Sequence, residues 1–189
     1  MADTHSTTEL LIGLTGNGFL IDSFFLGFAE ATVFLVPLIL ILMFLKGGKA
    51  RKDSIFIFLT TIAGIVVSYG LGLLYFHQKP PIIYETLVSA EPGNSFPSQH
   101  TATLFSFALG VLLRKRKTQC LILGVIAVLT GFSRVIVGHH FVVDILGALI
   151  AALLAGLVVS FFEEEIDVFA TLILDSLEKI YRVLDLENS

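Results

Sequence analysis

The stretch SRVIVGHHFVVD, from Ser133 to Asp144, places an arginine, two histidines and an aspartate inside a long apolar run. Charged and titratable side chains are costly at membrane depth, and where they occur they usually serve a function together with a partner. We therefore expect these residues to form part of a polar site in a membrane-embedded chain, with partners that come from other parts of the sequence.

Apolar runs extend through most of the chain. Of the 189 residues, 55% are hydrophobic, and the mean hydropathy is +0.89, well above that of soluble domains. A spanning helix needs about 20 residues, and the third run is short, so we expect it to begin before Thr101. Because the runs are too long for strands and show no alternation, we predict helices. The predicted spans are Phe24–Leu45, Ser54–Phe76, Thr101–Leu113, Cys120–Val137 and Phe141–Phe162.

The predicted fold is all-α, a polytopic membrane helical bundle with about five transmembrane helices and short terminal helices. We expect one membrane-embedded domain over residues 1–189, with a short leading helix within residues 1–20 and a tail helix within residues 163–189. The tail is acidic, which does not suit an anionic lipid surface. Two interpretations of it are open: a helix that caps the bundle or binds a partner, and a solvated, half-packed tail. Its apolar residues recur at helical spacing, at Ile166, Phe169, Ile173, Leu177, Ile180 and Leu184.

Positive charge is concentrated in two loops. The positive-inside rule places these loops and the C-terminus in the cytoplasm, and the second and fourth loops outside. Lys79 and Arg134 then lie at or near the outer face together with four histidines. We predict a multi-pass protein of the cell membrane whose polar site faces the extracytoplasmic side. The two loops hold eight of the twelve Lys and Arg residues, at Lys46, Lys49, Arg51, Lys52, Arg114, Lys115, Arg116 and Lys117.

His140 and Asp144 are four residues apart, a spacing that puts two side chains on one face of a helix. Asp144 would then accept a hydrogen bond from the ring of His140, which fixes the tautomer and leaves the other ring nitrogen nucleophilic. Arg134 lies near the outer end of the fourth run, where a guanidinium can bind phosphate oxygens in a bidentate fork.

Two further polar clusters come from other parts of the chain. In SFPSQHTATLF, Pro97 and Ser98 indicate the start of a helix, whose N-terminal N–H groups form an anion site with His100 in the first turn. In HQKPPI, at the end of the second run, Lys79 supplies a cation. Two cations, a helix N-terminus, a nucleophile with its orienting carboxylate and a second histidine are the set that phosphoryl transfer needs.

Each of these residues also has a structural interpretation. A histidine near a helix end is more often interfacial or hydrogen-bonded than catalytic, and Lys79 is compatible with a membrane anchor whose ammonium reaches the interface. Glu30, inside the first run, is expected to be neutral or paired within the bundle; contact with the site and a structural hydrogen bond are equally open. The chain shows no Cys/His spacing typical of a metal site, and we expect no metal, no cofactor and no nucleic-acid partner.

The same residues carry a family resemblance. The segment Ser133–Asp144 matches Ser-Arg-x5-His-x3-Asp, the third signature of the type 2 phosphatidic acid phosphatase superfamily, at every fixed position. The segment Pro97–His100 resembles the second signature, Pro-Ser-Gly-His, with Gln99 in the glycine slot, and Lys79-Pro80 resembles the end of the first, Lys-x6-Arg-Pro. Within this superfamily, which the chain resembles over residues 18–162, it is most similar to the bacitracin-resistance type of undecaprenyl diphosphate phosphatase.

This resemblance implies hydrolysis of the terminal phosphate of a polyprenyl diphosphate, without a metal. It implies that His140 is the nucleophile, that Asp144 orients it, and that His100 protonates the leaving oxygen and then activates water. The chain departs from the family at Lys79, where arginine is usual, and at Gly72, where the first signature has its lysine. The phosphate site implied by the resemblance consists of Lys79, Ser98, Gln99, Ser133, Arg134, Gly138 and His139.

Two other functions remain open at this level. The first is the same chemistry on another lipid phosphate, such as phosphatidic acid, phosphatidylglycerol phosphate or a lipid A phosphate, since the signatures concern the phosphate and not the lipid. The second is a lipid transporter or binding protein on the same fold, which the presence of His100, His140 and Asp144 disfavours. The oligomeric state cannot be predicted from the sequence.

Overall fold

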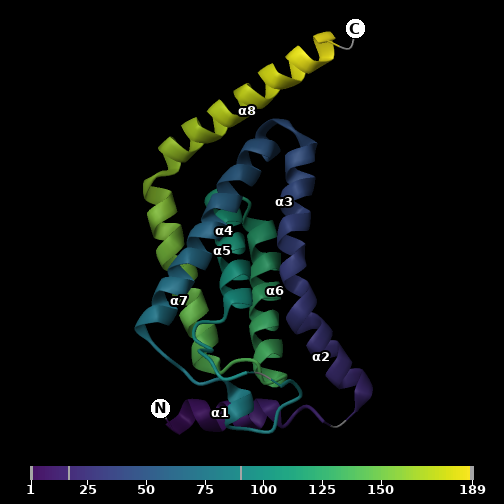
Figure 1. Ribbon diagram of the computed structural model, residues 1–189, viewed down its shortest axis with the longest axis vertical. Helices are drawn as coiled ribbons and strands as arrows, with labels where there is room; N and C mark the ends of the chain where they lie inside the picture. Colours follow the sequence, from purple (N-terminus) through teal and green to yellow (C-terminus); the bar gives the residue numbers. More distant parts are fainter. Residues whose placement is uncertain (1, 17, 90, 188–189) are drawn as a thin grey trace.

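The computed structural model describes residues 2–16, 18–89 and 91–187, and this part of the chain is almost entirely helical (Figure 1). Within these ranges the β structure is limited to an isolated bridge between Gln78 and Asn94. The predicted all-α membrane bundle is confirmed. The helices are α1 (Ala2–Ile12), α2 (Phe19–Ala31), α3 (Leu35–Lys46), α4 (Gly48–Leu74), α5 (Gln99–Leu113), α6 (Lys117–Ile136), α7 (Val142–Phe161) and α8 (Glu163–Glu187), with 3₁₀ turns η1 (Thr32–Phe34) and η2 (Pro80–Ile82).

Four helical segments are long and apolar enough to cross a membrane: Phe19–Lys46, Gly48–Leu74, Lys117–Ile136 and Val142–Phe161. They correspond to four of the predicted runs, and the first three begin earlier because the helices continue into the flanking residues. The third predicted run is α5, which begins before Thr101 as expected. Its 15 residues rise about 22 Å, less than the roughly 30 Å of a hydrocarbon core. The short α5 leaves room at one end of the bundle for the long loop 75–98.

The first span is broken between α2 and α3. Pro37, in the first turn of α3, has no N–H to donate to the carbonyl of Val33, and the chain forms the 3₁₀ turn η1 just before it. Beyond this break, α3 packs against α4 whereas α2 contacts α6, and Figure 1 shows α2 tilted relative to α3. The part of the first span formed by α2 therefore lies against α6, and the part formed by α3 lies against α4.

Helix α5 occupies the centre of the bundle and packs against α4, α6 and α7. Its side chains Leu104 and Phe107 are fully or almost fully buried. Helix association in membranes depends on close backbone approach, which small residues permit. A side chain at Gly64 of α4 would overlap Ser106 of α5, and the face of α7 that packs inward is built of alanines, at Ala148, Ala151, Ala152 and Ala155.

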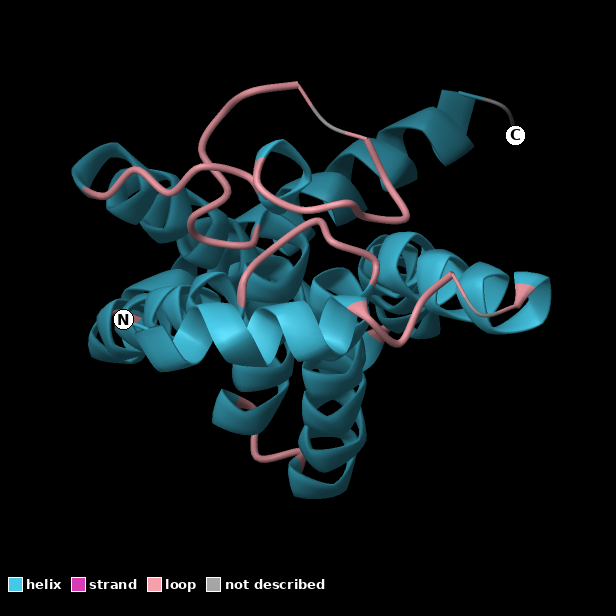
Figure 2. Cartoon of the chain, turned by 90° about the horizontal axis from the view of Figure 1, so that it is seen from below, coloured by secondary structure: helices cyan, strands magenta, loops and turns pink. Residues whose placement is uncertain are grey.

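Helix α1 lies across the end of the bundle where α6 ends and α7 begins (Figure 2). The Thr8 hydroxyl accepts a hydrogen bond from the backbone N–H of Val142, at 3.5 Å. The helix ends at Ile12, so the leading helix predicted within residues 1–20 is shorter than that range. Loop 75–98 lies at the same end, so this face of the bundle carries both a helix and the longest loop (Figure 2).

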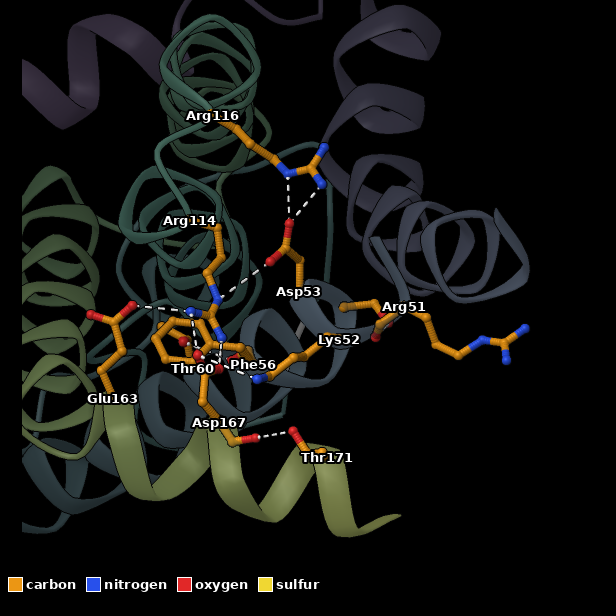
Figure 3. Close-up of polar contacts among 11 residues, drawn as sticks. Arg51, Lys52, Asp53, Phe56, Thr60, Arg114, Arg116, Glu163, Asp167 and Thr171 are labelled. Atoms are coloured by element: carbon orange, nitrogen blue, oxygen red, sulfur yellow. Dashed lines mark hydrogen bonds and ion pairs between the residues drawn. The ribbon is translucent and has the colours of Figure 1, made fainter. Parts of the chain in front are cut away.

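The two loops that carry most of the cations lie together at the opposite end of the bundle. Asp53 of α4, only 3% exposed, accepts hydrogen bonds from Nε and Nη2 of Arg116 at 3.2 and 2.7 Å (Figure 3). Nε of Arg114 lies 3.6 Å from the same carboxylate. The guanidinium of Arg114 also donates to Glu163 and Asp167 in the first turns of α8. The start of the tail helix is therefore docked on the bundle, whereas later apolar residues such as Leu172, Leu177 and Ile180 are exposed.

Candidate active site

A cavity of about 420 Å³ lies at the end of the bundle that carries loop 75–98. Its walls come from the end of α4, the loop that follows, the first turn of α5, the end of α6 and loop 137–141. The structure thus brings together side chains from all three polar clusters of the sequence. The charged, imidazole and amide side chains in the lining are Lys79, Asn94, Gln99, His100, Arg134, His139 and His140.

The two histidines are presented to the cavity by a tight turn after α6. The backbone N–H groups of His139 and His140 both donate to the carbonyl of Arg134, at 2.9 and 3.3 Å. Gly138 makes this turn possible because its φ is +88°, a conformation that other L residues rarely adopt. A side chain at this position would also overlap Thr86. Gly138 itself is not part of the cavity lining, so the turn and the contact with Thr86 account for the glycine.

The ring of His140 is held in one tautomer by a backbone carbonyl. Nδ1 of His140 lies 2.9 Å from the carbonyl oxygen of Ser95. Because a carbonyl only accepts hydrogen bonds, Nδ1 carries the proton, and in the neutral ring Nε2 has the free lone pair. Sequence reasoning did not identify Ser95 in this role.

Asp144 contacts His140, but not in the predicted way. His140 lies before α7, which begins at Val142, so the two residues do not share a helical face. Instead, Asp144 sits in the first turn of α7, where Oδ2 accepts the backbone N–H of Phe141 at 2.8 Å and lies 3.5 Å from Nδ1 of His140. The carboxylate therefore stands beside the same ring nitrogen as the Ser95 carbonyl.

His77 is the other partner of Asp144, and its role was missed in the sequence. Nδ1 of His77 donates to Oδ1 of Asp144 at 2.9 Å, and its ring packs on Phe141 with a centroid separation of 4.2 Å. His77 does stand two residues before Lys79 in a polar cluster, but nothing in the sequence pairs it with a residue 67 positions later. Asp144 is fully buried and receives hydrogen bonds on both oxygens, so its orientation is fixed.

The residues around the start of α5 are less exposed to the cavity than the resemblance implies. Ser98 precedes the helix, but its hydroxyl pairs with that of Thr101 at 3.0 Å instead of capping a backbone N–H. Gln99 lines the cavity, and its Nε2 donates to Ser68 at 3.0 Å. Ser133 is buried in α6 and outside the lining. Of the predicted phosphate and catalytic residues at the start of α5, Gln99 and His100 therefore line the cavity, whereas Ser98 does not.

The cationic side of the cavity is formed by Arg134 and Lys79. Arg134 is 6% exposed, and its Nη1 donates to the carbonyl of Ala29 and to Glu30. Lys79 is half-buried, and its side chain passes over Gly93. A buried guanidinium and a more accessible ammonium in one cavity form a site suited to an oxyanion with several charges. In the described part of the chain, no cluster of three or more Asp, Glu, His or Cys side chains could hold a metal ion.

Both histidines of loop 137–141 are held in the neutral form. Burial lowers the pKa of His140, although the hydrogen bond with Asp144 acts in the opposite direction. Burial, and next the charge of Arg134, lowers the pKa of His139 from its usual 6.5 to about 4. At neutral pH, His140 therefore presents an unprotonated Nε2, which is the form that can attack phosphorus.

Comparison with known proteins shows the family to which the chain belongs. A model of the PAP2 superfamily matches residues 54–167. The chain is 33% identical over 175 residues to undecaprenyl-diphosphatase BcrC of Bacillus subtilis (strain 168), and this covers 91% of the chain and 90% of that protein.

Two solved structures share the fold. LpxE of Aquifex aeolicus gives a TM-score of 0.70 with 24% identity, covering 84% of this chain and 95% of that one. A transmembrane PAP2-type phosphatidylglycerolphosphate phosphatase from Bacillus subtilis gives a TM-score of 0.64 with 26% identity, covering 87% and 88%. With its apolar helices, the protein is a multi-pass membrane lipid phosphatase, and the chain belongs to the PAP2 superfamily.

Proposed function

We propose that the protein hydrolyses the terminal phosphate of a polyprenyl diphosphate, such as undecaprenyl diphosphate, and so recycles a lipid carrier of cell-surface glycans. The observation that carries the proposal is the meeting of His140, His100, Arg134 and Lys79 around one cavity at the end of a membrane bundle, with Asp144 in contact with His140 from outside the lining. The relative that spans about nine-tenths of both chains is an undecaprenyl-diphosphatase, which supports this substrate class.

In this mechanism, Nε2 of His140 attacks the terminal phosphorus. A P–N bond forms, the bond to the bridging oxygen breaks, and His100 gives a proton to the departing prenyl monophosphate. His100 then takes a proton from water, whose oxygen attacks the phosphohistidine and releases inorganic phosphate. Arg134 and Lys79 stabilise the charge on the equatorial oxygens, while Asp144 and the Ser95 carbonyl hold the ring of His140.

A second candidate is a phosphatase of a glycerophospholipid phosphate, because one structural neighbour acts on phosphatidylglycerol phosphate. The substrate can be assigned by measuring kcat/KM of the purified protein for a prenyl diphosphate, phosphatidylglycerol phosphate and phosphatidic acid in the same detergent micelles. We expect the prenyl diphosphate to be preferred by about tenfold or more. A higher kcat/KM for a glycerolipid would assign the enzyme to the second candidate. A His140→Ala preparation controls for contaminating phosphatases.

Lys79→Ala is expected to lower turnover of a prenyl diphosphate by about 10²–10³-fold, the usual effect of losing one preorganised donor to a developing oxyanion. Lys79→Arg should retain activity, because arginine restores the charge with a larger, planar head group. The measurement is the steady-state kinetics of both variants, with folding checked by thermal unfolding. If Lys79→Ala stays within about threefold of wild type in both kcat and KM, Lys79 is a membrane anchor and not a phosphate ligand.

We further propose that the cavity faces the extracytoplasmic side and that the C-terminus is cytoplasmic, because the opposite end of the bundle carries the cationic loops. In intact cells, a membrane-impermeant thiol reagent is expected to label Ser89→Cys and not Gly48→Cys, both in a Cys120→Ala background. Both positions are exposed on the protein, so accessibility across the membrane decides the result. Labelling at position 48 alone would place the cavity on the cytoplasmic side.

A further inference from the structure

Glu30 contacts the cavity residues from a helix that the family match does not include. It lies on α2, before residues 54–167, yet its carboxylate touches three groups of the cavity. Oε1 of Glu30 lies 2.8 Å from Nε2 of His139 and 3.1 Å from Nη1 of Arg134, and Oε2 lies 3.7 Å from Nε2 of His100. One carboxylate thus connects Arg134 with two of the three histidines that line the cavity.

The contact with Arg134 involves only one part of the guanidinium. Nη1 donates to the carbonyl of Ala29 at 3.2 Å and to Glu30. Nε is buried and has no hydrogen-bond partner within the described residues. A guanidinium binds a phosphate in a bidentate manner through the parallel N–H groups of Nε and Nη2. Because Nη1 is bound to α2, the N–H groups of Nε and Nη2 are the ones left to bind a phosphoryl group.

The position of Glu30 relative to Arg134 is fixed by packing. Ala29 is fully buried, and the hydroxyl of Thr32 on the α2 side pairs with that of Thr130 on α6 at 2.9 Å. The break after α2 is what brings this segment onto α6. Arg134, His139 and His100 line the cavity whereas Glu30 does not, so its carboxylate contacts lining residues without being one of them.

We propose that Glu30 is a positioning residue for phosphate binding: it holds Arg134 and His139 so that the Nε–Nη2 edge of the guanidinium faces the phosphoryl group. The inference rests on the proposed role of Arg134 in binding phosphate. Without the carboxylate, the guanidinium loses its charged acceptor and can turn away from the cavity, while His140 and its partners are unaffected. Anion binding should therefore weaken more than the chemical step.

The test compares Glu30→Ala, Glu30→Gln and the control Asp22→Asn, which removes a carboxylate from the same helix. Inorganic phosphate is the probe, through its inhibition constant and through the rise in unfolding temperature that it causes. In Glu30→Ala, KM and the phosphate inhibition constant should both rise about tenfold, with kcat changed less than about threefold. Glu30→Gln keeps an acceptor oxygen at the same position and should stay within about threefold of wild type, as should Asp22→Asn.

Three results would overturn the proposal. The first is an unchanged or lower phosphate inhibition constant in Glu30→Ala, which would mean that the carboxylate does not support anion binding. The second is a Glu30→Gln variant as impaired as Glu30→Ala, which would assign the effect to charge and not to position. The third is a loss of activity that merely follows a loss of folded protein. The stabilisation by phosphate is measured without any lipid, so it tests Glu30 even if prenyl diphosphates prove not to be substrates.

Discussion

His140→Ala is expected to lower hydrolysis of a prenyl diphosphate by at least about 10⁴-fold, because the variant has no nitrogen to attack phosphorus. Removal of the imidazole leaves Asp144 hydrogen-bonded to His77 and to the backbone N–H of Phe141, so the fold should persist. The measurement is phosphate release by purified enzyme, with the folded state checked by size-exclusion chromatography and thermal unfolding.

His140→Gln is the matched control for this prediction. Its amide can still donate to the carbonyl of Ser95, yet it offers no nucleophilic nitrogen, so it should be as inactive as His140→Ala. Turnover of either variant within about tenfold of wild type would rule out His140 as the nucleophile and would move the search to His100 and His139.

Asp144→Asn is expected to lower kcat by about 10²–10³-fold. In serine proteases, the equivalent change costs about 10⁴, because the asparagine stabilises the wrong tautomer. Here the carbonyl of Ser95 also holds the proton on Nδ1 of His140, so part of the orientation survives and the loss should be smaller. The substitution removes the negative charge of Asp144. In the wild type, this charge stabilises the positive charge that develops on the His140 ring when Nε2 is phosphorylated.

The KM of Asp144→Asn provides the control for this prediction. KM should change little, because Asp144 does not line the cavity. A variant with kcat within about threefold of wild type would show that the Ser95 carbonyl alone orients the nucleophile, and that Asp144 serves to anchor loop 75–98 through His77.

The fold could be predicted because hydropathy determines where helices lie in a membrane protein. The runs and the two cationic loops follow from composition, and the structure places α4, α6 and α7 where they were expected. The break in the first span was not predicted, although Pro37 was visible, because a proline near the middle of an apolar run is also common in unbroken transmembrane helices.

The candidate site could be predicted only as a set of residues. The signatures identified several side chains that line the cavity, but also Ser98, Ser133 and Gly138, which do not line it, and they did not indicate the contacts. His140 and Asp144 were assigned to one helix, whereas the helix begins between them, because the left-handed Gly138 and the turn after it delay its start. The sequence left open whether Glu30 contacts the site, but it did not predict the roles of His77 and Ser95, because these residues lie far from Asp144 and His140 in sequence and no local pattern indicates such pairings.

The central claim is that His140 carries the phosphoryl group during turnover. The most direct measurement is rapid mixing of enzyme with a prenyl diphosphate labelled in its terminal phosphate, followed by alkaline quenching and peptide mass spectrometry. His100→Ala removes the proton donor of the first step and the base of the second, so formation and hydrolysis of the intermediate should both be slower. We predict a base-stable, acid-labile phosphohistidine at His140. Labelled phosphate release without any phosphohistidine at this residue, in wild type and in His100→Ala, would contradict the mechanism.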